Sequence, residues 1–331
     1  MIIQPKRTSF FWPVILVGAG VILLLRNFGI LQDFNFQILF RLWPLILVVI
    51  GLDLIFGHRF PWVGALIGLL TIGVAILFLY YAPSLGINLP AGVKTEVLST
   101  PLGDTERVVY NLDTSYEPVS INALTGTSDL FEATITHRGQ LNFDVRGDAE
   151  KSVSLSETTT SDNWFTVDLG LADLKWDIGL APVVPSVINL DGGSGALEIY
   201  LEGIALESLR ANLGSGASKI KLPAANTAYT VNLDSGSGAV NISLPGETDL
   251  TLTLSSGSGA VTIQAPPDAA LKVEILDDGS GSVHLRADLE LVKGDGDFEN
   301  DTWQTPNYDT STRQILIRIV DRGSGSFFIK N

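Results

Sequence analysis

The sequence predicts an N-terminal α-helical membrane domain with three transmembrane helices, followed by an all-β repeat domain of short stacked strands resembling a β-solenoid. Three observations lead to this fold class. Residues 1–90 are strongly apolar and carry a formal charge of +3, so the remainder of a chain of net charge −15 carries −18. The tripeptide Gly-Ser-Gly occurs six times in the C-terminal half. Segments beyond residue 94 alternate apolar and polar residues with a period of two, as half-buried strands do.

Three apolar stretches occupy the predicted membrane domain, residues 1–82. They run over Phe10–Leu25, Ile38–Phe56 and Pro61–Tyr81, and a helix needs roughly 17–25 such residues to cross a bilayer. A cleavable signal peptide is rejected for the first stretch because two further apolar runs follow it. Aromatic residues near the stretch ends are predicted to anchor them at the lipid–water interface: Trp12, Trp43, Trp62, Tyr80 and Tyr81.

Basic residues indicate how the membrane domain is oriented, because they concentrate on the cytoplasmic side. With a cytoplasmic N-terminus, Lys6, Arg7 and Arg59 lie inside, whereas Arg26 and Arg41 lie outside. This distribution favours a multi-pass membrane protein whose β-domain is extracytoplasmic. The inverted orientation stays open at this point.

After a predicted linker over 83–93, the β-domain divides into an N-terminal part, 94–187, and a repeat part, 188–331. Copies of Gly-Ser-Gly begin at intervals of 21, 22, 21, 22 and 44 residues. Each unit reads as a strand, a small-residue corner and a second strand, and such a unit buries its apolar face only by stacking on its neighbours. The strands Ile315–Ile319 and Phe327–Ile329 are expected to cap the stack.

The glycines of the repeats are predicted to be structural corners. Glycine adopts positive φ without a Cβ penalty, and the small intervening serine lets successive corners stack. We expect Asp191, Asp234 and Asp278, which precede corners, to accept hydrogen bonds from turn amides. The predicted corner glycines are Gly193, Gly195, Gly214, Gly216, Gly236, Gly238, Gly257, Gly259, Gly279, Gly281, Gly323 and Gly325.

Composition excludes several kinds of chemistry. The absence of cysteine excludes disulfides, zinc–thiolate sites and cysteine nucleophiles, and the acidic β-domain argues against nucleic acid as a partner. No Lys-Ser/Thr pair follows the glycine corners and no helix is expected to begin there, as a phosphate-binding loop requires. No catalytic constellation is found either, so we expect no enzyme, cofactor or metal. The cluster in Asp295–Asp301 is interpreted as a solvated loop, with calcium binding as the alternative.

Two sets of residues carry a resemblance to known families. Trp12-Pro-Val-Ile-Leu16 matches Trp43-Pro-Leu-Ile-Leu47. With Ile50-Gly-Leu-Asp-Leu54 these segments resemble the transmembrane region of LiaI/LiaF-like bacterial envelope proteins, which implies a bacterial cell membrane as the location. The run from Lys175 through the repeats resembles the toast-rack, or LiaF C-terminal, β-domain and related adhesin-like domains. The resemblance implies a role in cell-wall stress signalling, often by restraint of a membrane histidine kinase.

The sequence therefore predicts a non-enzymatic membrane protein that senses or regulates cell-envelope stress through protein–protein contacts. Its expected partners are the lipid bilayer and another membrane or envelope protein, with a sensor kinase as one candidate. A structural or adhesive surface protein is the alternative. An enzyme acting on envelope polymers is a third hypothesis, which requires acidic side chains clustered on one stacked face.

Overall fold

The computed structural model describes residues 93–114, 117–158, 174–276 and 279–331, together with single N-terminal positions at 16, 17, 47, 66, 69–71 and 73. The chain divides into two compact units, and the second contains residues 93–159 and 172–331. Among the described residues, no helix has the length and apolar character needed to cross a membrane. The three predicted apolar stretches lie almost wholly outside these residues, and the domain boundaries at 83, 94 and 188 stay predictions.

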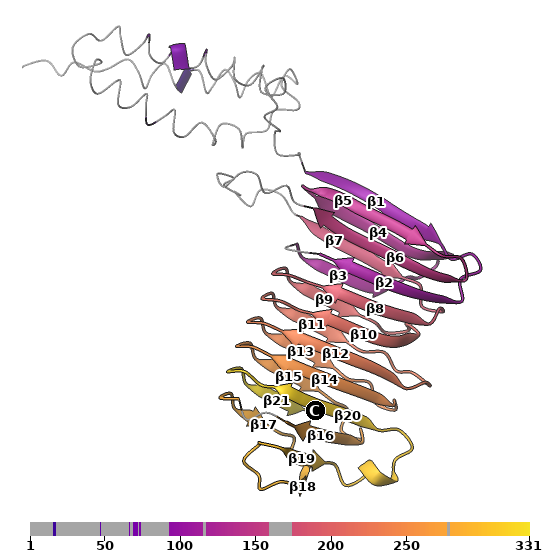
Figure 1. The fold of residues 1–331 in the computed structure, drawn as a ribbon, viewed down its shortest axis with the longest axis vertical. Coiled ribbons are helices and arrows are strands. Elements are labelled where there is room, and N and C mark those ends of the chain that lie inside the picture. Colours follow the sequence, from indigo (N-terminus) through magenta and orange to yellow (C-terminus); the bar gives the residue numbers. More distant parts are fainter. Residues whose placement is uncertain are drawn as a thin grey trace, which may run out of the picture. The chain divides into compact units, whose positions relative to one another are not determined.

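The all-β prediction is confirmed in its coarse form, since the second unit consists mostly of strands in two large sheets (Figure 1). In spatial order the first sheet contains β1 (Lys94–Pro101), β4 (Asp129–His137), β7 (Lys175–Leu180), β3 (Val119–Ala123), β9 (Leu197–Tyr200), β11 (Ser218–Lys221), β13 (Val240–Ser243), β15 (Val261–Gln264), β21 (Phe327–Lys330) and β17 (Val283–His284).

The second sheet contains, again in spatial order, β18 (Glu290–Lys293), β19 (Asp301–Gln304), β16 (Leu271–Ile275), β20 (Ile315–Asp321), β14 (Leu250–Ser256), β12 (Tyr229–Ser235), β10 (Leu206–Asn212), β8 (Ser186–Asp191), β2 (Arg107–Asp113), β6 (Glu150–Thr158) and β5 (Gln140–Arg146). A short 3₁₀ helix, η2 (Tyr308–Thr310), lies between β19 and β20.

Each Gly-Ser-Gly copy joins one strand of the second sheet to one strand of the first, and we call this pair of strands a coil. The first to sixth coils, numbered by their glycine copies along the chain, are β8–β9, β10–β11, β12–β13, β14–β15, β16–β17 and β20–β21. Neighbouring coils pair in parallel, so equivalent side chains form rows across the sheets. One such row runs through Ile199, Ile220, Ile242 and Ile263.

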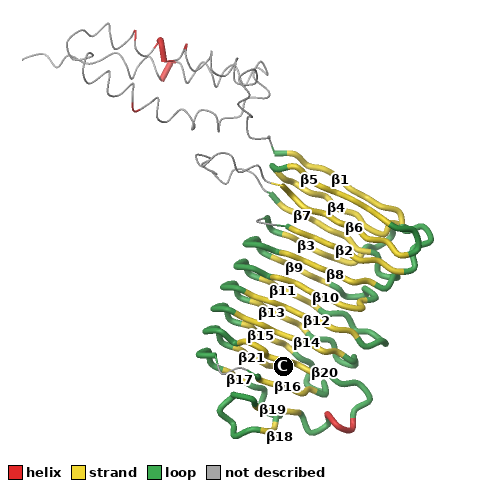
Figure 2. The backbone as a smooth tube through the Cα atoms, viewed as in Figure 1, coloured by secondary structure: helices red, strands yellow, loops and turns green. Residues whose placement is uncertain are grey.

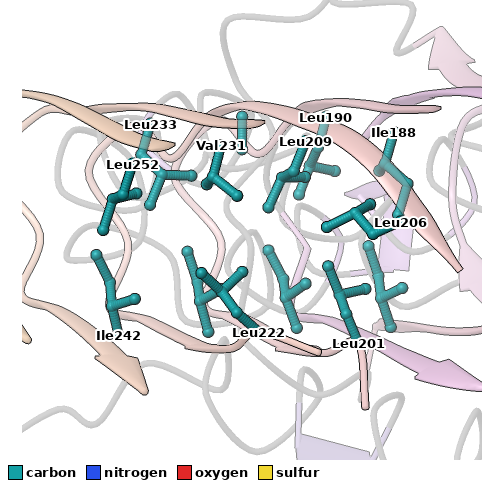
Figure 3. Packing of buried hydrophobic residues seen from close by; sticks show 14 of the residues in the cluster. Ile188, Leu190, Leu201, Leu206, Leu209, Leu222, Val231, Leu233, Ile242 and Leu252 are labelled. Atoms are coloured by element: carbon teal, nitrogen blue, oxygen red, sulfur yellow. The ribbon is translucent and has the colours of Figure 1, made fainter. Parts of the chain in front are cut away.

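Period-two alternation explains why the coils stack. In β12 the burial alternates along the strand, with Tyr229, Val231 and Leu233 buried and the residues between them more exposed. Side chains such as Val231 and Leu252 from the second sheet face Ile242 from the first sheet and Leu222, which directly follows β11 (Figure 3). Full burial of each such aliphatic side chain stabilises the fold by about 1.5–3 kcal/mol, so the core is continuous from coil to coil.

The stack begins with a coil that lacks Gly-Ser-Gly. Strands β2 and β3, which we call the leading coil, pair in parallel with the first coil, so that Asn111 aligns with Asn189 and Asp113 with Asp191. At its corner the amide of Thr114 donates to the Asp191 carbonyl at 2.9 Å. Beyond this coil, β4 pairs antiparallel with β1 and β7, and β5 pairs antiparallel with β6.

The expected position of the last two strands is wrong. They do not cap the stack, because β20 lies between β14 and β16 and β21 lies between β15 and β17 (Figure 1). The sixth coil is therefore inserted between the fourth and the fifth. Its apolar side chains, among them Ile317 and Phe327, are fully buried there. The sequence pattern did not exclude this order, because coils with the same alternation fit on either side of one another.

Candidate functional site

The predicted corner glycines lie side by side at the turns of successive coils. The amide of Ser215 donates to the Gly193 carbonyl at 3.0 Å, and the amide of Gly236 donates to the Gly214 carbonyl at 2.8 Å. Equivalent bonds join later copies, and the corner loops lie one above another at the ends of the strands (Figure 2). Hydrogen bonds thus continue through the corners as well as the strands, which makes the corners part of the stacked structure.

Close approach, more than backbone conformation, explains why these positions are glycine. A Cβ atom on Gly238 would lie 1.8 Å from the Gly216 carbonyl oxygen, and one on Gly325 would lie 1.9 Å from that of Gly259. No side chain fits at such distances. Positive φ, the reason expected from the sequence, applies among the predicted corners only to Gly193, Gly214 and Gly323.

The five predicted interface anchors lie outside the described residues and stay predictions. They are Trp12, Trp43, Trp62, Tyr80 and Tyr81.

A shallow depression lies on the outer face of the second sheet, over β6, β2, β8 and β10, and we call it the trough. Its volume is about 390 Å³. Outward-facing side chains line it in two rows, because alternate residues of in-register parallel strands share a face. The lining residues are Asn111, Leu112, Asp113, Ser154, Leu155, Ser156, Asn189, Leu190, Asp191, Arg210 and Asn212.

One row of the trough, which we call the inner row, contains the amides of Asn111 and Asn189, the hydroxyl of Ser154 and the guanidinium of Arg210. The amide of Asn189 donates from Nδ2 to Asn111 Oδ1 at 2.9 Å. Asn111 in turn donates from Nδ2 to Ser152 Oγ at 3.3 Å and to Ser154 Oγ at 3.5 Å. Arg210 aligns with Asn189 at the other end of the row. These bonds fix the orientation of the amides, so the row presents a preorganised polar surface.

The outer row of the trough is acidic. Asp113 and Asp191 align on neighbouring strands, followed by Asn212 and Asp234 on the next two. Adjacent strands lie about 4.8 Å apart, so the exposed carboxylates form a stripe along the strand ends. This is the acidic row that the enzyme hypothesis required. However, Asp113 and Asp191 lie on an open, exposed face, whereas acid–base chemistry generally takes place in sites that exclude water.

Two of the expected turn contacts are replaced by others. Among the described residues, the corner amides that receive a side-chain cap are Gly214, bonded to Asn212 Oδ1 at 3.2 Å, and Gly323, bonded to Asp321 Oδ1 at 2.8 Å. Asp191 and Asp234 instead project from the outer face, and Asp278 lies outside the described residues. The expectation was wrong for those two, because the corner amides of the described residues bond to Asn212 and Asp321 instead.

The loop at Asp295–Asp301 brings three carboxylates together. Oxygens of Asp295, Asp297 and Asp301 lie within 4.8 Å of one another, so these residues could hold a cation. The carboxylate of Asp301 already accepts the Phe298 amide at 2.8 Å. A hydrogen bond from the Glu299 amide and one involving Asp295 lower the pKa of Asp297. The loop is thus closed by its own amides, and Asp301 is buried within it. The solvated-loop interpretation and its calcium-binding alternative both stay predictions.

Histidine and glutamate meet at one further place, the turn between β4 and β5. His137 is buried, with Nδ1 3.0 Å from the Gly139 carbonyl and Nε2 3.3 Å from Glu96 Oε1. Glu157 is also buried and accepts the Gly139 amide. Burial keeps His137 and Glu157 from direct contact with a substrate, so we assign them to the turn.

Asn111 and Asp113 were missed as site residues by the sequence analysis. The signal that could have found them is the tripeptide Asn-Leu-Asp, which occurs at Asn111–Asp113, Asn189–Asp191 and Asn232–Asp234. It precedes a corner each time. The search for Gly-Ser-Gly overlooked the leading coil because its corner has other residues.

Comparisons with known proteins agree with the sequence analysis. Residues 10–55 match the model of the LiaI-LiaF-like transmembrane region, and residues 90–243 match that of the N-terminal domain of toast_rack. The resemblance to these two families is confirmed. The trough lies inside the toast_rack match, whereas the fourth, fifth and sixth coils lie beyond it.

One solved structure is similar, the "putative cell adhesion protein from Clostridium sporogenes ATCC 15579". It is 19% identical, covers 72% of this chain and 99% of its own, and has a TM-score of 0.47. No curated protein matches the chain.

Proposed function

We propose that this protein is a non-enzymatic, multi-pass membrane protein that regulates the response to cell-envelope stress through protein–protein contacts. One observation carries the proposal: a single chain joins a LiaI-LiaF-like transmembrane region to a toast_rack domain. Neither is a known enzyme. The polar, rigid outer faces of the two sheets support a role in binding more than in a reaction.

The trough is the proposed contact surface. Its carboxylates at Asp113 and Asp191 accept hydrogen bonds from cationic or amide groups, and Arg210 donates to carbonyl or carboxylate groups. A partner segment with basic and polar side chains complements that arrangement. Because stacked strands hold these groups in place, little conformational entropy is lost on binding. The partner we propose is another membrane or envelope protein, with a sensor kinase as one candidate.

The proposed arrangement keeps the three membrane crossings and the interfacial anchors predicted from the sequence. The β-domain is then extracytoplasmic, and its coils wind as a β-solenoid. A reporter fused after Asn331 tests the orientation. Activity on the outer side of the membrane supports it, and a cytoplasmic signal contradicts it.

The function is tested by deleting the gene and restoring it with matched variants. We expect the deletion to alter the response to cell-wall antibiotics, and the wild-type gene to restore it. Asp191→Lys and Asp234→Lys reverse the same charge in the same row, but only Asp191 lines the trough. We expect D234K to restore the response and D191K to fail at equal protein level. An unaltered response in the deletion strain contradicts the regulatory role.

A further inference from the structure

The fourth and fifth coils are complementary to each other although the sixth coil separates them. Leu250, Ile315 and Leu271 share one row, as do Leu252, Ile317 and Val273. Leu250 and Leu271 are 21 residues apart, which is the separation between Tyr229 and Leu250 in directly paired coils. With the sixth coil removed, β16 therefore matches β14 in the register used elsewhere in the stack.

The connections allow the same conclusion. Six residues, 244–249, join β13 to β14 and advance the chain by one coil. Six residues, 265–270, also join β15 to β16, yet here the chain advances by two coils. A link of this length thus suffices for direct pairing of the fourth and fifth coils. The sixth coil follows a connection over 285–314 that contains β18 and β19. Because β19 pairs with β16 of the fifth coil, residues 305–314 are the link on which the sixth coil can leave and return.

Polar contacts hold the sixth coil in place near the start of its first strand, β20. Asp249, just before β14, accepts the Gln314 amide at 3.0 Å and the Arg313 guanidinium at 2.8 Å. On the opposite side, Arg318 donates to Glu274 at 2.8 Å. These groups are partly exposed, so each contact contributes little. The insert is held mainly by its buried apolar row and by its corner.

The geometry points to the space between the fourth and fifth coils as an insertion site for a strand–corner–strand segment, with the sixth coil as an exchangeable occupant. When that coil leaves, the fourth and fifth coils pair directly. The stack then loses one coil and, on balance, one coil–coil interface. No apolar gap stays open between the fourth and fifth coils, because each coil of a stack contacts only its nearest neighbours. In trans, the occupant is the sixth coil of a second copy, as in domain swapping.

Cysteine pairs in the full-length chain distinguish the two states, and the chain has no native cysteine to interfere. In the pair T253C/R318C the two residues are neighbours while the sixth coil is inserted. In T253C/E274C they are two strands apart, about 9.6 Å, beyond the Cα separation of roughly 7 Å that a disulfide spans. Direct pairing brings them to about 4.8 Å. A second pair, T251C/K272C, reports the same change while leaving the Arg318–Glu274 contact intact.

Gly325→Ala biases the equilibrium, because its Cβ would lie 1.9 Å from the Gly259 carbonyl oxygen. In membranes containing the full chain, we expect this variant to raise the T253C/E274C disulfide roughly a thousandfold relative to T253C/R318C, a ratio equivalent to about 4 kcal/mol. Gly246→Ala is the matched control, since its Cβ makes only an ordinary contact at 3.8 Å. It should change neither pair.

Exchange in trans is tested by co-expressing a T253C chain with an R318C chain, both carrying G246A or both carrying G325A. We expect an interchain disulfide with G246A, and less of it with G325A. Two results overturn the inference. One is loss of the T253C/R318C disulfide in G325A without a gain at T253C/E274C or T251C/K272C. The other is the absence of any interchain product.

Discussion

The two halves of the β-domain differ in how their strands pair. At one end, β1, β4 and β7 pair antiparallel without Gly-Ser-Gly corners. In the repeat coils, by contrast, every strand pairs in parallel with its equivalent and the corners stack directly on one another. Parallel stacking brings corner backbones so close that side chains are excluded, whereas antiparallel strands connect through turns that need not stack. The regular spacing of the glycines therefore marks the positions at which the corners of successive coils touch.

The largest expected effect comes from a side chain placed between stacked corners. Gly238→Ala should destabilise the domain by at least about 4 kcal/mol, because the carbonyl it meets belongs to a backbone fixed on both sides. Gly126→Ala, in the loop between β3 and β4, should cost only about 1 kcal/mol, since it has positive φ but open space. Chemical denaturation of both variants measures the difference. Equal losses would mean that corner contact is not the reason for glycine.

Truncating an apolar side chain should also destabilise the repeat coils more than the antiparallel end, although by less than a side chain at a corner does. Ile242 is fully buried between stacked coils, and Ile242→Ala should cost about 3 kcal/mol. Leu141 lies on β5, the outermost described strand of its sheet, and is only partly buried. Leu141→Ala should cost about 1 kcal/mol. A larger loss at Leu141, measured by thermal unfolding, would contradict a core centred on the coils.

Much of the repeat architecture was predictable from sequence, and its order was not. The period of 21–22 residues and the alternation in Val240–Leu244 predicted two strands per unit with one buried face. The inserted sixth coil escaped prediction because Ile315, Ile317 and Ile319 carry the alternation that any coil requires. Only the three-dimensional register shows which neighbours they meet. The trough was only partly predictable, since the repeated Asn-Leu-Asp marks its residues at 111–113 and 189–191, whereas their position side by side depends on strand pairing.

Acid should loosen the inserted coil in preference to the others. Hydrogen bonds from Gln314 and Arg313 hold the pKa of Asp249 below its ordinary 3.8. A depressed pKa contributes stability that is present above the ordinary value and lost as the pH falls through the folded value. The T253C/R318C disulfide should therefore decline below about pH 4. Asp249→Asn should remove that part of the pH dependence, and an unchanged profile would exclude Asp249 as its source.

The smallest expected effect is the difference in the free energy of unfolding between variants at capped and at uncapped corners. Asp321→Ala should cost about 1 kcal/mol, because Asp321 accepts the Gly323 amide. Asp234→Ala, at the corresponding strand end of another coil, should stay within about 0.5 kcal/mol. Urea titration of the two variants makes the comparison. If Asp234→Ala costs as much as Asp321→Ala, the acidic row has a structural role beyond the exposed surface we assign to it.

Hydrogen exchange on the full-length protein in membranes tests the central claim most directly, namely that the coils and their corners form one rigid surface. The account predicts that the amides of Ser215, Gly236 and Ser258, bonded from corner to corner, exchange as slowly as those of the adjoining strands. The amide of Gly126, in an open loop, should exchange much faster. Corner amides that exchange as fast as Gly126 would contradict the account.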